Sequence, residues 1–106
     1  MFTYNHNIPA TPAGAGVTRK VLSHSEGLMV CEITLEAGSR IASHAHPHEQ
    51  ITYVIIGKCR YTVGDTTAEV AAGDSVLIPG NVPHSIQVLE TTKVIDAFSP
   101  AREDFL

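Results

Sequence analysis

The stretch GSRIASHAHPHEQITYVIIG, residues 38–57, decides both the fold and the candidate site. His44 and His46 are two residues apart, and residues two apart on an extended backbone point to the same face. Both imidazoles can therefore face one point. Gln50 follows them, and the apolar, β-prone run of residues 51–56 predicts a strand that is covered on both faces.

A second stretch, GDSVLIPGNVPH at residues 73–84, adds a third imidazole, that of His84, after a short apolar run and two prolines. Imidazole is a good ligand for Zn, Ni, Cu and Fe. Three imidazoles and one amide oxygen, from His44, His46, His84 and Gln50, therefore predict a site for a divalent transition metal. Ni, Zn, Fe, Mn and Cu all suit these ligands.

Two neighbours of these residues are expected to stay outside the ligand set. His48 has the parity of His44 and His46 but follows Pro47. We therefore expect His48 to be a polar residue at the mouth of the β-barrel that is predicted below. Its alternative roles are to orient a ligand or to contact a substrate. Glu49 should point away from the face that carries Gln50, although an exchange of their roles stays open.

Composition indicates one cytoplasmic domain that binds neither nucleic acid nor membrane. The chain has 106 residues, a net charge of -4 and only seven Lys plus Arg, with no basic run. No apolar stretch is long enough to span a membrane, and the N-terminus lacks the pattern of a signal peptide. Cys31 and Cys59 alternate with apolar neighbours, which predicts reduced core thiols.

The order of short alternating segments predicts an all-β fold. Residues 1–16 are rich in Asn, Pro, Ala and Gly and are expected to form a loose arm, followed by one barrel domain over residues 17–106. We expect eight or nine strands, with a tight hairpin around Gly57 and Lys58 and separate strands over residues 84–90 and 93–99. Such spacing favours a closed or nearly closed β-sandwich barrel.

Asp96 is the unusual residue of the last predicted strand. It shares a face with Val94 and Phe98, and Arg102 follows shortly afterwards. A carboxylate directed into an apolar barrel is costly unless it is paired or functional. Asp96 can act as a general acid or base, and Arg102 can hold a substrate carboxylate. The structural alternative is an ion pair of Asp96 with Arg19 or Arg60.

The stretches at residues 38–57 and 73–84 resemble the paired motifs of the cupin superfamily. The matching positions are Gly38, His44, His46 and Gly57 in the first motif and Gly73, Pro79 and His84 in the second. The departures are Gln50 in place of Glu, Asn81 in place of Gly and Val88 in place of Asn. The resemblance implies a jelly-roll barrel, the double-stranded β-helix, with metal ligands His44, His46, Gln50 and His84.

A narrower resemblance covers residues 16–106. The segments VTRK and HPHEQ, the spacing of Asp96, Phe98 and Arg102, and the ending PAREDFL look like small cupins of the KdgF type. This resemblance implies metal-dependent conversion of 4,5-unsaturated monouronates from pectin or alginate to open-chain 5-keto-4-deoxyuronate. It also implies that Asp96, Phe98 and Arg102 take part in the activity and that the substrate is a small sugar acid.

Two other functional classes use the same residues. A metal-dependent dioxygenase or a polyketide cyclase would need the same three histidines, and substrate-dependent oxygen uptake would favour the dioxygenase. A module that binds sugar acids without turnover is the other alternative. We also expect a homodimer, because small cupins of this kind commonly pair and because the first strand has no evident partner within the chain.

Overall fold

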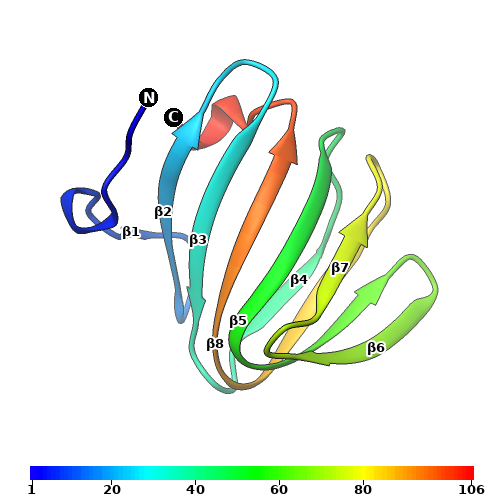
Figure 1. Cartoon of the computed structure of the whole chain (residues 1–106). Helices are drawn as coiled ribbons and strands as arrows, with labels where there is room; N and C mark the ends of the chain where they lie inside the picture. The colour runs from blue at the N-terminus through cyan, green and yellow to red at the C-terminus, as the bar shows by residue number, and fades with distance from the viewer.

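The computed structural model describes residues 1–106 and consists almost entirely of antiparallel strands (Figure 1). The strands are β1 (Thr11–Pro12), β2 (Val17–His24), β3 (Met29–Leu35), β4 (Arg40–His44), β5 (Glu49–Val63), β6 (Thr66–Ala71), β7 (Ser75–Ile78) and β8 (His84–Ser99). Short 3₁₀ helices, η1 (Asn5–Asn7) and η2 (Glu103–Phe105), lie near the two ends. The predicted all-β fold is confirmed.

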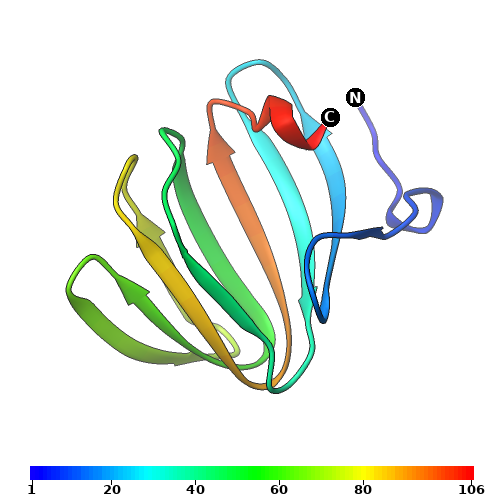
Figure 2. The ribbon, with the colours of Figure 1, turned by 180° about the vertical axis from the view of Figure 1, so that it is seen from behind.

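The long strands β5 and β8 belong to both layers of the fold (Figure 2). The first half of β5 pairs with β7 and with the second half of β8, which also pairs with β3. The second half of β5 pairs with β6 and with the first half of β8, which also pairs with β4. The two long strands therefore curve from one layer into the other and close the jelly roll.

The predicted hairpin at Gly57 is wrong, because β5 continues through this residue as one bent strand. Gly57 has φ of 95°, and a Cβ atom there would lie 2.6 Å from Thr92 Cα on β8. Only glycine accommodates this bend and this close approach. The pairing register shifts at the same place, so the irregularity changes the direction of the strand without ending it.

The two strands predicted over residues 84–90 and 93–99 are likewise one strand, β8. Thr92 lies at its bend, fully buried, and its hydroxyl donates to the carbonyl oxygen of Glu90 at 2.7 Å. The Thr92 hydroxyl oxygen also accepts a hydrogen bond from the backbone N–H of Lys58 at 3.0 Å. The polar side chain thus satisfies backbone groups at the bend, which preserves the strand where its sequence reads as a turn.

The expectation that the first strand lacks a partner is also wrong. β2 pairs with β3 along most of its length, with Val17 opposite Leu35 and Val21 opposite Cys31. β3 places alternate apolar residues on the inner face, and β2 adds Val17 and Val21 to that surface, with Arg19 between them. The predicted N-terminal arm contains η1 and the two-residue strand β1, which pairs with the start of β2.

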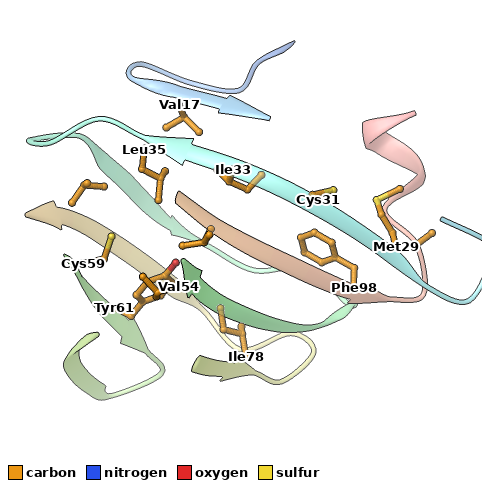
Figure 3. Close-up of a cluster of buried hydrophobic side chains, with 13 residues drawn as sticks. Val17, Met29, Cys31, Ile33, Leu35, Val54, Cys59, Tyr61, Ile78 and Phe98 are labelled. Atoms are coloured by element: carbon orange, nitrogen blue, oxygen red, sulfur yellow. The ribbon is translucent and has the colours of Figure 1, made fainter. Parts of the chain in front are cut away.

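The core lies between the two layers (Figure 3). On β3, Met29, Cys31, Ile33 and Leu35 are buried, as their alternation predicts. Burying one such aliphatic side chain contributes roughly 1.5–3 kcal/mol. Cys31 is free and buried, as is Cys59 on β5, which confirms the prediction of unpaired core thiols. No helix here has the length and apolar character that crossing a membrane requires.

Candidate metal centre

The paired strands β4 and β8 bring two of the predicted ligands together. His44 ends β4 directly opposite His84, the first residue of β8, and their ring centroids are 4.3 Å apart. His46 lies in the following loop, with its ring centroid 5.0 Å from that of His84. One ligand atom from each of the three imidazoles lies within 4.8 Å of the others. The structure therefore gathers the three predicted histidines at one point.

Backbone carbonyl groups fix the orientation of all three rings. The hydrogen bonds run from Nδ1 of His44 to the oxygen of Ala42 (2.9 Å), from Nδ1 of His46 to that of His48 (3.0 Å) and from Nδ1 of His84 to that of Val82 (2.9 Å). A carbonyl oxygen only accepts, so each Nδ1 carries the ring proton. Each Nε2 therefore has a free lone pair, as a metal ligand needs.

The unpaired atoms at this point fit a cation. Nε2 of His84 is buried and has no hydrogen-bond partner, although an unsatisfied buried acceptor is costly. Nε2 of His46 lies 3.1 Å from Oε1 of Gln50, and with the proton on Nδ1 both of these atoms are acceptors. A divalent cation between the ligand atoms would satisfy both sets of lone pairs. The three histidines and the Gln50 oxygen therefore fit a metal centre.

Burial disfavours the charged form of two of these imidazoles. It lowers the pKa of His46, and the nearby charges of Arg102 and His84 lower it further. Burial is also the largest cause of the lowered pKa of His84. A proton competes with a metal for the same nitrogen, so a lowered pKa extends metal binding toward lower pH.

Of the two neighbours of these residues, Glu49 lies as the sequence predicts. Glu49 is exposed, whereas Gln50 is buried, so only Gln50 faces the centre. His48 is half-buried, and its backbone oxygen accepts the hydrogen bond that orients His46. Its ring centroid lies 5.5 Å from that of His46. His48 thus supports the centre through its backbone.

A chain of hydrogen bonds connects the Gln50 amide with Asp96. The register of β5 and β8 places Thr52 opposite Asp96 and Gln50 opposite Phe98. Nε2 of Gln50 donates to the Thr52 hydroxyl oxygen at 3.0 Å, and this hydroxyl donates to Oδ1 of Asp96 at 2.6 Å. These bonds turn the Gln50 oxygen toward the histidines and hold the carboxylate in place.

Asp96 is half-buried and forms no ion pair. The alternative that Arg19 or Arg60 neutralises it is wrong, since Arg60 pairs with Glu69 at 2.9 Å and no ion pair involves Arg19. Burial raises the pKa of Asp96 to about 6, and the Thr52 hydrogen bond opposes this shift. A carboxyl group with such a pKa can take up and release a proton near neutral pH.

Phe98 and Arg102 lie beside the centre. The Phe98 ring stands edge to face with His46, with centroids 5.9 Å apart. The Arg102 guanidinium carbon lies 5.2 Å from the Phe98 centroid, and its Nε and Nη2 atoms donate to both carboxylate oxygens of Asp104 at 3.1 and 2.9 Å. All three predicted catalytic residues, Asp96, Phe98 and Arg102, therefore border one cavity. Two of the Arg102 nitrogens already donate to Asp104.

This cavity has a volume of about 240 Å³ and lies inside the barrel. Ligand-type side chains occur among its lining residues, namely Arg19, His44, Gln50, Tyr61, His84, Asp96 and Arg102. Apolar residues such as Ile33, Val94 and Phe98 form much of the remaining wall. A cavity with an apolar wall and a few convergent polar groups is typical of a small-molecule site.

Several residues of this site were not predicted from the sequence. Thr52 has the parity of Gln50, which was the available signal. Arg19, considered above only as an ion-pair partner of Asp96, has the parity of the buried Val17. Tyr61 reaches the cavity from the second half of β5, and burial raises its pKa, so its hydroxyl keeps its proton. Phe105 comes from η2, and a short C-terminal segment gives no periodic signal of where it folds back.

Comparison with known proteins gives one consistent family. Residues 31–98 match the cupin domain family. The chain is 33% identical over 100 residues to the pectin degradation protein KdgF of Dickeya dadantii. The aligned region covers 92% of this chain and 91% of that protein.

Solved structures agree. KdgF from Halomonas sp. superposes with a TM-score of 0.95 at 30% identity, covering 100% of this chain and 98% of the other. An RmlC-like cupin from Shewanella frigidimarina gives a TM-score of 0.95 at 33% identity, covering 99% and 95%. The fold, the three-histidine centre and these similarities together place the chain in the cupin family, among the proteins that resemble KdgF.

Proposed function

We propose that this protein is a metal-dependent enzyme that opens 4,5-unsaturated monouronates, released from pectin or alginate, to 5-keto-4-deoxyuronate. The observation that carries the proposal is the Gln50–Thr52–Asp96 chain, which joins the candidate metal centre to a carboxyl group inside the cavity. The similarity to KdgF supplies the substrate class.

The reaction is an isomerisation that moves one proton. The anomeric hydroxyl loses its proton, C1 becomes an aldehyde, and the bond between C1 and the ring oxygen breaks to leave an enolate at C4 and C5. A proton added to C4 then gives the ketone at C5. No oxidant, reductant or further reactant is needed, so one group that first accepts and then returns a proton is sufficient.

Asp96 is suited to this transfer. As a carboxylate it accepts the proton of the anomeric hydroxyl, and as a carboxylic acid it returns that proton to C4. Its raised pKa, about 6, makes both directions accessible near neutral pH. Phe98 and the other apolar lining residues give the substrate a largely apolar wall, and Tyr61 offers a hydroxyl donor to a sugar oxygen.

His44, His46, His84 and the Gln50 oxygen would hold the metal. A divalent cation bound there would supply positive charge that stabilises the negative charge developing as the ring opens.

The direct test uses purified, metal-loaded protein and unsaturated galacturonate. We expect loss of the conjugated alkene absorbance faster than the spontaneous reaction, with 5-keto-4-deoxyuronate as the product identified by NMR. Binding of the sugar acid without turnover would instead favour the binding module, and oxygen consumption would favour the dioxygenase. Either outcome would contradict the proposed reaction.

Thr52→Val should lower kcat roughly 10- to 100-fold, because outer residues that orient ligands and catalytic groups typically contribute this much. Valine keeps the volume of the side chain but neither accepts from Gln50 nor donates to Asp96. Thr52→Ser retains the hydroxyl and should keep most of the activity. Equal rates for the valine and serine variants would remove the hydrogen-bond chain from the mechanism.

We also propose a cytoplasmic homodimer. Ile51, Tyr53 and Leu77 are 51%, 50% and 57% exposed, and the register places Ile51 opposite Leu77 on the outer face of β5 and β7. Adjacent exposed apolar residues favour a protein interface and therefore support the dimer. The free thiols of Cys31 and Cys59 support the cytoplasmic location, because they agree with a reducing compartment. Light scattering should give twice the mass of one chain, and the mass of a single chain would contradict the dimer.

A further inference from the structure

Arg19 is a cation without an anionic partner inside the cavity. It lies on β2 two residues from the buried Val17, lines the same cavity as His44 and Asp96, and is half-buried. Its guanidinium takes part in no ion pair and no side-chain hydrogen bond. Its one specific contact is with the Phe105 ring, whose centroid lies 3.6 Å from the guanidinium carbon.

Arg102, the other arginine of the cavity, already has an anionic partner. The Asp104 carboxylate, held at 2.9 Å, already neutralises Arg102 and occupies two of its nitrogens. Arg102 also packs on Phe105, with its guanidinium carbon 4.2 Å from the ring centroid. A ligand carboxylate that approached Arg102 would have to compete with Asp104, whereas all five N–H donors of Arg19 remain available.

A guanidinium recognises a carboxylate through two parallel hydrogen bonds, and its face can stack on an aromatic ring at the same time. Stacking on Phe105 fixes the plane of the Arg19 fork while leaving its edge free. From this geometry we infer that Arg19 binds the carboxylate of the sugar acid and sets the preference for acids over neutral sugars. Arg102, held by Asp104, is then a positioning residue for Phe98 and Phe105.

The inference rests on the proposed function for its substrate class, but binding tests it without turnover. Calorimetry would compare D-galacturonate with neutral D-galactose on metal-loaded protein. Wild type should prefer the acid. Arg19→Met, which keeps apolar contact with Phe105, should weaken galacturonate binding roughly 10- to 100-fold, as expected for a lost charge-assisted hydrogen bond, and leave galactose binding unchanged. In turnover, KM for the unsaturated uronate should rise while kcat stays close to that of wild type.

Two further variants separate recognition from stability and from general charge. Arg40 is exposed on β4 and does not line the cavity, so Arg40→Met makes the same change of charge and should leave the acid preference intact. Arg19→Lys keeps the charge without the fork and should retain part of the preference. If Arg19 only tethers η2, Arg19→Met will lower stability with an unchanged acid-to-neutral ratio, and that result overturns the inference.

The outcomes also separate this inference from the proposed reaction. An unchanged acid preference in Arg19→Met, or no preference in wild type, would overturn the role of Arg19 even if the uronate is converted. An acid preference that depends on Arg19, with no conversion of any unsaturated uronate, would support the carboxylate site and overturn the proposed reaction.

Discussion

Asp96→Asn should lower kcat for the unsaturated uronate roughly 10²- to 10⁴-fold, the usual contribution of a general acid or base. Asparagine has nearly the shape of aspartate and can still accept the hydrogen bond from Thr52, but it cannot exchange a proton at neutral pH. Asp65→Asn, in the exposed turn between β5 and β6, makes the same change of charge and should leave the rate unchanged. Equal rates for wild type and Asp96→Asn would exclude Asp96 from the chemistry.

The pH dependence of wild type should report the same group. The reaction begins with Asp96 as a carboxylate, so kcat/KM should fall about tenfold per pH unit below about pH 6, where the raised pKa of Asp96 lies. Asp96→Asn should lose this limb from its profile. A limb of the same position in the variant would assign the titration to another residue.

As the pH rises through about 6, the stability of the wild type should fall while its activity rises. Folding raises the pKa of Asp96 from 3.8 to about 6, so the native state favours the neutral carboxyl. The stability that this neutral form contributes is present below about pH 4 and is lost as the pH rises through about 6. Metal-free Asp96→Asn should therefore match wild type at pH 4 and exceed its free energy of unfolding by about 1–3 kcal/mol at pH 7 to 8. Urea denaturation at both pH values measures this difference.

His84→Ala should remove the metal and, with it, roughly 10³-fold or more of the activity. The Nε2 atom of His84 is buried, is directed at the other ligands and has no alternative partner, so its loss removes a ligand without disturbing another hydrogen bond of that atom. His44→Ala should have a similar effect. Elemental analysis after dialysis should give an equimolar amount of divalent metal for wild type and much less for both variants.

His48→Ala is the matched control for these variants. It removes an imidazole next to the centre but keeps the backbone oxygen that orients His46. Its metal content should equal that of wild type. Retention of an equimolar metal in His84→Ala, or its loss in His48→Ala alone, would show that the ligand set is wrong.

Local spacing predicted that the three histidines converge because the relevant residues are close in sequence and their parity is regular. His44, His46 and Gln50 lie within a few residues of each other, and Pro83 and the preceding apolar run placed His84 at the start of a strand. The alternation on β3 and on the end of β8 likewise predicted which residues, including Asp96, face the interior.

The sequence did not reveal features that depend on contacts between distant strands. Gly57 reads as a turn, but the approach of Thr92 from β8 makes it a bend within one strand. The pairing of Thr52 with Asp96 depends on the register of β5 and β8, which local propensity does not determine. The unpaired state of Arg19 follows from where every other charge lies, so it was visible only in the folded chain.

An anomalous difference map from crystals of the purified protein, collected at the absorption edge of the metal found by elemental analysis, would locate the metal directly. We predict a single strong peak within bonding distance of Nε2 of His44, His46 and His84 and of the Gln50 amide oxygen, with the Gln50 amide nitrogen still directed at Thr52. A peak elsewhere in the chain, no peak at all, or a Gln50 side chain turned away from the three imidazoles would show that these four residues do not form the metal centre.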